Sequence, residues 1–453
     1  MSEGRLSRLG AASCAVLLAG IAVEISFADV ALLASASSAP SFAEARNYST
    51  GEYPVSVAVG DLNKDGKQDL TTANFGGQTV SVLFNRGGAR FGARRDYPTG
   101  RGPYSIAISD LNGDSNPDLA IANRDANTVS VRFNRGDGSF GARREYRMRP
   151  SPNWIASGDL TGDNKPDLAV ATRNADVVSV LVNNGDGTFA AGRDYRAMGG
   201  PKSVAVGDVN ADGALDLATP NQVLLNEGAG TFQPPLTLPG LDELLCGGVV
   251  TIGDLNGDGK PEIAGAAYEC RFVFVFLNRG DGSFRAQRRY PTTNREKPDG
   301  PSSVAIADLN GDRRPELAFV NGARVDSVSV LTNRGDGSFT AGRHYRTEFS
   351  PVSVAIGDLN GDGKPELATA NSLGSVSVLA NVTGRCAVPN VVRRPLPVAR
   401  ETIAFAGCRV RTVRRAYSTT IGEGRVISEK PRPGTLLRNR AKVNLVVSRG
   451  RQS

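Results

Sequence analysis

The chain contains few of the residues on which most enzymes and transition-metal centres depend. Its 453 residues include one histidine, His344, and one tryptophan, Trp154, and only 6% of them are aromatic. A single histidine argues against most general-base chemistry and most histidine-ligated metals. His344 also stands at a repeated position that other repeats, described below, fill with Asn, Asp, Glu or Arg. We therefore predict that the protein is not an enzyme.

Long apolar runs are also scarce, whereas glycine is abundant, with 53 residues. Much glycine with few aromatic residues is typical of many short strands and tight turns rather than of long helices. Charged residues of both signs are plentiful, which argues against disorder. The length suits two or three domains.

The first 41 residues differ in character from the rest. Arg5 and Arg8 precede an apolar stretch, residues 11–23, and small residues follow at 34–39. A basic start, an apolar segment and a small-residue cleavage site are typical of a secretory signal. Glu24 and Asp29 interrupt the run, so it lacks the roughly 20 apolar residues of a membrane-spanning helix. We predict a signal peptide at 1–41, cleaved near 36–41, and a bacterial protein that is secreted or cell-wall-associated with no remaining membrane span.

A motif close to Val-Gly-Asp-Leu-Asn occurs seven times. Its aspartates are Asp61, Asp110, Asp159, Asp208, Asp254, Asp308 and Asp358. A second motif, Asn-x-Gly-x-Gly/Ala-x-Phe, follows in six of the seven repeats. The segments between them alternate apolar and polar residues, as half-buried strands do, and leave room for about four strands per repeat. This arithmetic predicts a mainly β fold, a seven-bladed β-propeller. A linear solenoid is the alternative, but it usually has a shorter period.

The last repeat lacks the segment that ends most of the others. Phe91 is followed six residues later by Tyr97, and similar pairs recur, but the seventh repeat stops near Gly384. The same pair occurs at the other end of the chain, as Phe42 and Tyr48. We therefore expect an N-terminal strand that closes the last blade and removes the open sheet edges. The propeller is assigned to residues 42–384.

Each repeat also has oxygen-bearing side chains at positions 1, 3, 5 and 9 of a nine-residue loop. In the first four repeats these are Asp61, Asn63, Asp65, Asp69; Asp110, Asn112, Asp114, Asp118; Asp159, Thr161, Asp163, Asp167; and Asp208, Asn210, Asp212, Asp216. In the last three they are Asp254, Asn256, Asp258, Glu262; Asp308, Asn310, Asp312, Glu316; and Asp358, Asn360, Asp362, Glu366. Alternate oxygen ligands in a tight loop suit a hard cation, and the carboxylates would repel one another without it. We predict seven calcium sites.

Turns held by the Asp and Asn side chains alone, without metal, are the alternative interpretation of these loops. Seven copies with one carboxylate spacing favour calcium. Position 6, where the loop bends, is glycine in four repeats but Ser115, Asn164 and Arg313 in the others. The charge of Arg313 disfavours cation binding in the sixth loop. A structural role for calcium is expected, since extracellular modules bind it at about 10⁻⁴ to 10⁻³ M.

With these motifs, residues 42–384 resemble the FG-GAP/VCBS repeat family, whose propellers also form the head of integrin α-subunits. Phe91-Gly92 and Phe140-Gly141 match the FG element, and Gly102-Pro103 and Gly200-Pro201 approximate its companion. The resemblance implies a calcium-stabilised propeller used in adhesion or ligand recognition. It does not fix the ligand, because such repeats also occur beside enzymes and in lectin-like proteins.

Residues 385–453 differ from the repeats in charge. They hold 16 Lys and Arg against 3 Asp and Glu, a net charge of +13, whereas residues 42–384 hold 35 against 40, a net charge of −5. A basic domain suggests nucleic acid, an anionic membrane or an anionic wall polymer as partner. Export disfavours nucleic acid, so we expect none to be bound.

The order and spacing of motifs across residues 387–449 resemble a PASTA domain. They include Val388-Pro389-Asn390-Val391, Pro431-x-Pro433-Gly434 and residues 443–447. The resemblance implies one helix on a three-stranded sheet and binding to peptidoglycan fragments of the bacterial wall. A spacer is the alternative role for a single copy. We assign residues 385–449 to this domain and 450–453 to a tail.

Four cysteines remain after the predicted cleavage, and an exported chain allows them to form disulfides. Cys246 and Cys270 are equidistant from Asp258, so a hairpin would set them opposite each other. Cys386 and Cys408 flank the first strand and the helix expected in the PASTA-like domain. We predict both disulfides; four buried thiols are the alternative.

These expectations favour an exported bacterial calcium-binding adhesion or ligand-binding protein, presented at or near the cell wall by its basic domain. Its partners would be peptidoglycan or another anionic wall polymer, and an unknown protein or glycan at the propeller. A carbohydrate-binding, lectin-like propeller is the nearest alternative, although only Trp154 and scattered tyrosines offer rings for stacking on sugars. A polysaccharide-degrading enzyme is a further alternative, but no catalytic constellation is found.

Overall fold

The computed structural model describes residues 39–240, 248–292, 300–322 and 325–451. The expected signal peptide lies almost wholly outside these ranges. Within them, no helix has the length and apolar character needed to span a membrane. The described chain is mainly β, as predicted, and its one α-helix is α2 (Leu396–Phe405).

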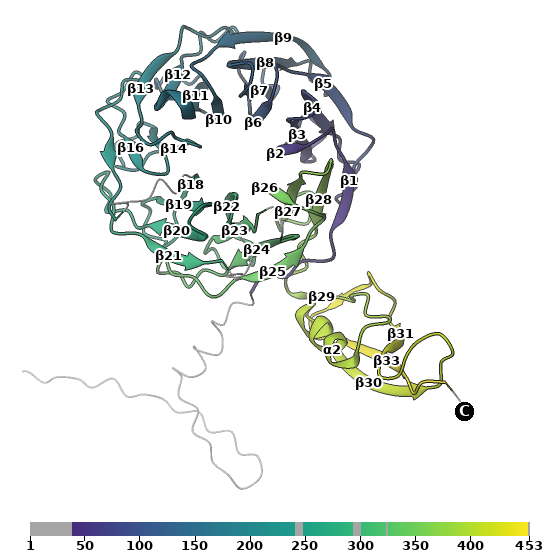
Figure 1. The fold of residues 1–453 in the computed structure, drawn as a ribbon. Helices are drawn as coiled ribbons and strands as arrows, with labels where there is room; N and C mark the ends of the chain where they lie inside the picture. Colours follow the sequence, from purple (N-terminus) through teal and green to yellow (C-terminus); the bar gives the residue numbers. More distant parts are fainter. Residues whose placement is uncertain (1–38, 241–247, 293–299, 323–324, 452–453) are drawn as a thin grey trace, which may run out of the picture. The chain divides into compact units, whose positions relative to one another are not determined.

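The repeats form four-stranded antiparallel sheets, seven of them among the described residues, which follow one another around a ring (Figure 1). The first three sheets are β2 (Pro54–Gly60), β3 (Asp69–Asn74), β4 (Thr79–Leu83), β5 (Arg95–Pro98); β6 (Pro103–Ser109), β7 (Asp118–Asn123), β8 (Thr128–Asn134), β9 (Phe140–Arg147); and β10 (Pro152–Gly158), β11 (Asp167–Thr172), β12 (Val177–Leu181), β13 (Arg193–Arg196). The next three are β14 (Ala205–Gly207), β15 (Asp216–Ala218), β16 (Gln222–Leu224), β17 (Leu236–Thr237); β18 (Gly248–Gly253), β19 (Glu262–Ala267), β20 (Phe272–Phe276), β21 (Arg288–Pro291); and β22 (Ser303–Ala307), β23 (Glu316–Val320), β24 (Ser327–Leu331), β25 (Arg343–Arg346). This repeated four-strand form is the one expected of propeller blades.

The remaining sheet combines the two ends of the repeat region. It contains β26 (Pro351–Gly357), β27 (Glu366–Asn371) and β28 (Ser375–Leu379), and its outer strand is β1 (Arg46–Ser49). Tyr48 lies opposite Val376 in this antiparallel pair, and Phe42 forms a further bridge to Asn381. Residues 42–48 thus lie where the missing segment of the last repeat was expected.

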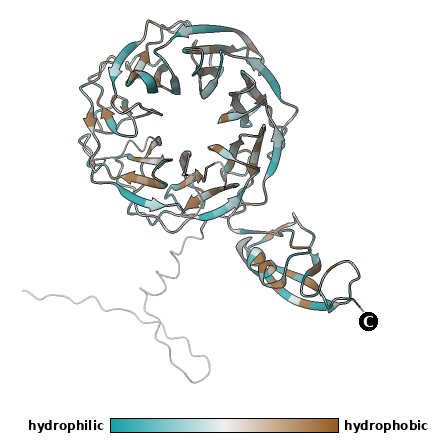
Figure 2. Cartoon of the chain, in the orientation of Figure 1, coloured by the Kyte–Doolittle hydropathy of each residue, from teal (hydrophilic) through white to brown (hydrophobic). Residues whose placement is uncertain are grey.

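Burial follows strand position within each sheet. All six residues of β3 are buried, whereas Arg95 and Asp96 of the outer strand β5 are exposed. Figure 2 shows the same contrast, with hydrophilic outer strands such as β9. Apolar side chains between neighbouring sheets form separate hydrophobic clusters, one of which joins Leu70 of the first sheet to Ala368 of the last. Burial of these side chains from water stabilises each sheet against the next.

Aromatic pairs also connect neighbouring sheets. Tyr97 of the first sheet packs edge-on against Phe140 of the second, with ring centroids 5.2 Å apart. Tyr48 packs in the same way against Phe91, at 5.1 Å, and so connects the last sheet to the first. The sequence pairs Phe and Tyr within one repeat, but the structure pairs the Tyr of one sheet with the Phe of the next.

The C-terminal domain has its own core. Its three-stranded sheet has the order β30 (Arg409–Ala416), β33 (Lys442–Ser448), β31 (Val426–Lys430), and a separate pair joins β29 (Arg385–Ala387) to β32 (Leu436–Arg438). Helix α2 buries Ala399 and Ile403 against Val443 and Leu445 of β33. The expected helix on a three-stranded sheet is therefore present.

Candidate functional site

The seven predicted cation loops occupy the same place in their sheets, between the first and second strands. Residues 61–69 run from the end of β2 to the start of β3, and the other six loops are placed in the same way. Position 9 is consequently the first residue of the second strand. Its carboxylate side chain is fully buried in every repeat: Asp69, Asp118, Asp167, Asp216, Glu262, Glu316 and Glu366.

Side chains of the first loop fold back on their own backbone. The Asp61 carboxylate accepts hydrogen bonds from the amides of Asp65 and Gly66, at 3.2 and 2.9 Å. Asn63 Oδ1 accepts from the Asp65 amide at 3.1 Å, and Asp65 accepts from Lys67 N at 3.0 Å. These bonds point the oxygens of positions 1, 3 and 5 into a compact loop. They also show that the loop can form from Asx-type turns.

The sharp bend is a shared feature of all seven loops. Position 6 has a positive φ in every one, including the non-glycine residues Ser115 (63°), Asn164 (62°) and Arg313 (65°). A Cβ added at Gly66 would meet no atom within 4 Å. Side chains are therefore tolerated at this position at the cost of the left-handed backbone conformation alone.

Burial raises the pKa of the carboxylates at position 9. It raises the pKa of Asp69, Asp118 and Asp216 to about 6, that of Glu262, Glu316 and Glu366 to about 7, and that of Asp167 in the same direction. In the first loop, amide hydrogen bonds from Asn85 and Leu62 oppose this rise in the pKa of Asp69, and the charges of Asp65 and Asp61 add to it. In the absence of a cation, the charged form of these carboxylates is therefore disfavoured.

Besides the hydroxyl of Thr161, two loop oxygens lack any hydrogen-bond partner although they are buried. They are Oδ1 of Asp208, at position 1 of the fourth loop, and Oδ2 of Asp312, at position 5 of the sixth. A buried carboxylate oxygen without a partner is costly, and a cation would satisfy it. Across the described ranges, however, no three His, Cys, Asp or Glu side chains form a group that could hold a metal. The loop carboxylates alone therefore do not form such a group, and a hard cation bound in a loop would also need its asparagine or main-chain oxygens as ligands.

The repeated spacing of the second motif has a role that could not be predicted from the sequence. The side-chain amide of Asn134 donates to the carbonyl of Leu62, at position 2 of the preceding repeat's loop, at 2.7 Å. Its main-chain amide donates to Asp118 of its own loop, at 2.8 Å. The same link between repeats is made from Asn85, Asn134, Asn183, Asn226, Asn278, Asn333 and Asn381, at 2.7–3.0 Å. Each loop is thus hydrogen-bonded to the next sheet.

His344 takes part in a repeated structural contact. Its Nδ1 lies 2.6 Å from Oγ of Ser329 on the neighbouring strand β24. Ser81 and Asp96 make the equivalent contact in the first sheet, also at 2.6 Å. The histidine therefore stands in for a carboxylate that binds a buried serine, which agrees with its interpretation as one of several interchangeable side chains.

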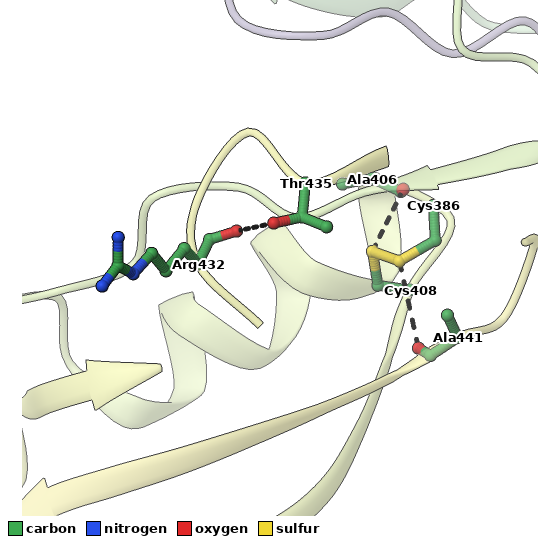
Figure 3. Close-up of a disulfide and its surroundings, with 6 residues drawn as sticks. All are labelled: Cys386, Ala406, Cys408, Arg432, Thr435 and Ala441. Atoms are coloured by element: carbon green, nitrogen blue, oxygen red, sulfur yellow. Dashed lines mark hydrogen bonds between the residues drawn. A yellow bond between two sulfur atoms is a disulfide. The ribbon is translucent and has the colours of Figure 1, made fainter. Parts of the chain in front are cut away.

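The C-terminal domain contains one of the two predicted disulfides. Cys386 and Cys408 are bonded, with Cα atoms 4.8 Å apart, and join β29 to the segment after α2 (Figure 3). The other predicted disulfide requires Cys246, which lies outside the described residues.

Strand β30 of the C-terminal domain displays four exposed arginines, Arg409, Arg411, Arg414 and Arg415. The positive charge predicted for this domain therefore faces solvent.

Family models match both parts of the chain. A model of the FG-GAP-like repeat matches residues 61–121, 110–170, 159–219, 254–319 and 314–369, which together exceed half of the chain. A PASTA domain model matches residues 387–449.

The curated relatives share only a short stretch with this chain. The probable serine/threonine-protein kinase PknB of Lactococcus lactis subsp. lactis is 38% identical over 65 residues, or 14% of this chain and 10% of the kinase. A probable serine/threonine-protein kinase of Clostridium acetobutylicum is 36% identical over 63 residues, with the same two shares. The chain thus spans about a tenth of the length of these relatives.

Solved structures resemble the chain in fold alone. A chain in the crystal structure of BBS1N in complex with ARL6DN, soaked with mercury, has a TM-score of 0.51 and 13% identity, covering 75% of this chain and 96% of that one. Saccharomyces cerevisiae Sqt1 has a TM-score of 0.51 and 10% identity, covering 75% and 99%. Together with the matched repeats and the loops described above, these findings establish that the chain belongs to the FG-GAP-like repeat family and carries a PASTA domain at residues 387–449.

Proposed function

We propose that this protein is an exported, calcium-stabilised binding module: a closed seven-bladed propeller that recognises a ligand and is held at a bacterial cell wall by its PASTA domain. The proposal rests chiefly on hydrogen bonds that connect each loop both to its own buried carboxylate and to the neighbouring sheet. Leu62 donates its amide to the buried carboxylate of Asp69, at 3.0 Å, and its carbonyl accepts from Asn134 of the next sheet. Neutralising this carboxylate with a cation would therefore stiffen the contact between the two sheets.

Calcium would be held by the carboxylate and amide oxygens of each loop, and it would supply positive charge where buried carboxylates gather. Equilibrium dialysis of the full chain against calcium tests this. We expect several ions per chain and one fewer in Asp254→Asn. Asp137→Asn, an exposed residue in a turn outside the loops, is the matched control and should bind as many ions as the wild type. Absence of bound calcium at millimolar concentration would remove this part of the proposal.

Attachment to the wall is supported by the PASTA match, by the net charge of +13 over residues 385–453 and by the exposed arginines of β30. The disulfide between Cys386 and Cys408 supports an oxidising, extracytoplasmic location. Co-sedimentation with purified insoluble peptidoglycan is the test. The double variant Arg411→Glu/Arg414→Glu should remain in solution, whereas Arg411→Lys/Arg414→Lys should sediment like the wild type. Equal sedimentation of all three proteins would contradict the proposed role of these charges.

We take the module to be non-catalytic. Its only histidine is engaged by Ser329, and its perturbed carboxylates are buried at the starts of strands rather than facing an open cleft. Incubation with wall polymers and other glycans, followed by chromatography of the products, tests this. Release of any fragment that depends on the protein would overturn it.

A further inference from the structure

A cavity of about 490 Å³ lies among the inner strands and is lined by residues from all seven repeats. Its residues stand at the ends of the strands opposite to the calcium loops: Tyr53 precedes β2, and Phe75 follows β3. This volume is within the usual range for a small-ligand site, about 300–1,000 Å³. No contact described above accounts for it.

Aromatic side chains gather on this cavity although they are far apart in the sequence. The ring of Phe75 lies 6.1 Å from that of Tyr53 and 6.1 Å from that of Tyr104, centroid to centroid. Trp154 and Tyr268 line the same cavity from two further sheets. Tyr53 is 50% exposed and Tyr268 38%. Large rings that converge on one cavity and remain partly exposed are typical of a binding surface.

The charged lining is mainly basic. Three basic residues, Arg124, Arg173 and Lys202, line it against one carboxylate, Glu269, whose Oε1 lies 2.6 Å from Lys202 Nζ. Arg124 Nε lies 3.4 Å from Oδ1 of its neighbour Asp125. The guanidinium carbon of Arg124 lies 5.3 and 5.2 Å from the ring centroids of Phe75 and Tyr104. Because this arginine already occupies the ring faces and other cations lie nearby, a cationic ligand is disfavoured. A carboxylate would instead pair well with a guanidinium.

Polar groups complete the lining. Asn153, Ser302, Ser303 and Ser353 come from three sheets. The Ser302 hydroxyl donates to a main-chain carbonyl, whereas those of Ser303 and Ser353 accept from main-chain amides and keep an O–H that can donate to a sugar hydroxyl. Tyrosine and tryptophan rings beside such groups suit the apolar faces and hydroxyl edges of sugar rings. An extended peptide would instead be recognised through a ladder of main-chain groups along a sheet edge.

We propose that this cavity binds an acidic oligosaccharide, with sugar rings against Tyr53 and Trp154 and a carboxylate paired with Arg173. The inference rests on the proposed function, that the propeller is a binding module, and adds the ligand class and its site. The cavity is distinct from the calcium loops, which lie at the other ends of the same strands.

Trp154 provides a local readout, because it is the only tryptophan in the chain. The full chain, with calcium present, is titrated with trigalacturonate and with the disaccharide of N-acetylglucosamine and N-acetylmuramic acid. Galactotriose and diacetylchitobiose are the neutral counterparts, and triglutamate is the acidic peptide. We expect saturable changes in tryptophan emission with at least one acidic sugar, and at least tenfold weaker binding of its neutral counterpart.

Variants then locate the site. Arg173→Ala and Tyr53→Ala should each weaken the binding of the acidic sugar about tenfold or more, and Arg173→Lys should lose less than Arg173→Ala. Arg147→Ala, an exposed arginine on the outer strand β9, should bind like the wild type. Response to neither acidic sugar, equal affinity for acidic and neutral sugars, or a response to triglutamate alone would each overturn the inference. Calcium binding and wall sedimentation, measured on the same protein, show separately whether the proposed function itself has failed.

Discussion

The side-chain amide of Asn85 donates a hydrogen bond of 2.7 Å to the carbonyl of Leu359, 274 residues further along the chain. The bond joins the first sheet to the loop of the last. The amide of Ala89 donates to the same carbonyl at 3.0 Å. Leu359 in turn donates its amide to the buried carboxylate of Glu366, at 2.8 Å. The contact between the two ends of the repeat region therefore has the same form as the contacts between consecutive repeats.

Removing one of these asparagines should destabilise the whole repeat region. Asn183 is buried and donates to the carbonyls of Leu111 and Pro166, at 3.0 and 2.9 Å. Asn183→Ala would leave both carbonyls without this partner, which we expect to cost about 1–3 kcal/mol of unfolding free energy. Asn184→Ala, at the exposed neighbouring residue, should change it by less than about 0.5 kcal/mol. Urea unfolding of the two variants makes the comparison, and equal midpoints would contradict a role for Asn183 between sheets.

Glycine at the fifth position of the second motif is explained by the neighbouring sheet. Gly138 has a φ of +75°, and a Cβ there would lie 2.4 Å from the Phe84 ring. Gly138→Ala should therefore destabilise the protein by about 1–3 kcal/mol through overpacking. The same change in a Phe84→Ala background should cost clearly less, because the obstructing ring is gone. Thermal unfolding of the double-mutant cycle measures this, and additive effects would show that the clash is not the cause.

Stability without calcium should depend on pH. Burial raises the pKa of the position-9 carboxylates to about 6 or 7, as for Asp69 and Glu366. In their protonated form these carboxylates stabilise the folded protein. This stabilisation is complete below a pH of about 4, the pKa of such groups in the unfolded chain, and it is lost as the pH rises through 6 to 7. In calcium-free buffer the melting temperature should therefore fall between pH 5 and 8, and calcium should reduce this fall. Glu366→Gln, which cannot ionise, should show a smaller fall than the wild type. A melting temperature that rises over this range in calcium-free buffer would contradict the account.

The disulfide of the PASTA domain should stabilise that domain alone. It closes a segment with a sequence separation of 22 residues, for which the loop-entropy model gives about 3 kcal/mol. Hydrogen exchange measured by mass spectrometry on the full chain should show faster exchange across residues 387–449 in Cys386→Ser/Cys408→Ser. Exchange in the repeats should not change. Unchanged protection of residues 387–449 would show that packing of α2 on its sheet is sufficient.

The local parts of this fold could be predicted from the sequence. The loop from Asp61 to Asp69 and the alternating strands on either side depend on neighbouring residues, and their repetition predicts the sheets; the cation ligands of the loops stay a prediction. Contacts across the ring could not be predicted in this way. Nothing in the sequence around Asn85 indicates a hydrogen bond to Leu359. The sequence pattern pairs Phe91 with Tyr97 of its own repeat, whereas in the structure the Phe91 ring packs against Tyr48.

The cavity could not be predicted from the sequence either, because its lining residues are far apart along the chain. Tyr53, Tyr104, Trp154 and Tyr268 are separated by about 50 residues or more, and in the sequence they read as scattered rings. Only the circular arrangement of the sheets brings them together. The repeat pattern could nevertheless have predicted the grouping of three of these rings, because Tyr53, Tyr104 and Trp154 all lie at or near the start of the first strand of their repeat.

The most direct test of the central claim is thermal unfolding of the mature protein with calcium and then with excess chelator. At a free concentration ten times the dissociation constant, each filled loop would add about 1.4 kcal/mol to the unfolding free energy. We therefore predict a large fall in melting temperature on chelation, reversed by calcium and not by magnesium. An unchanged melting temperature would contradict the account, because it would mean that the seven loops are held by their own hydrogen bonds and need no metal.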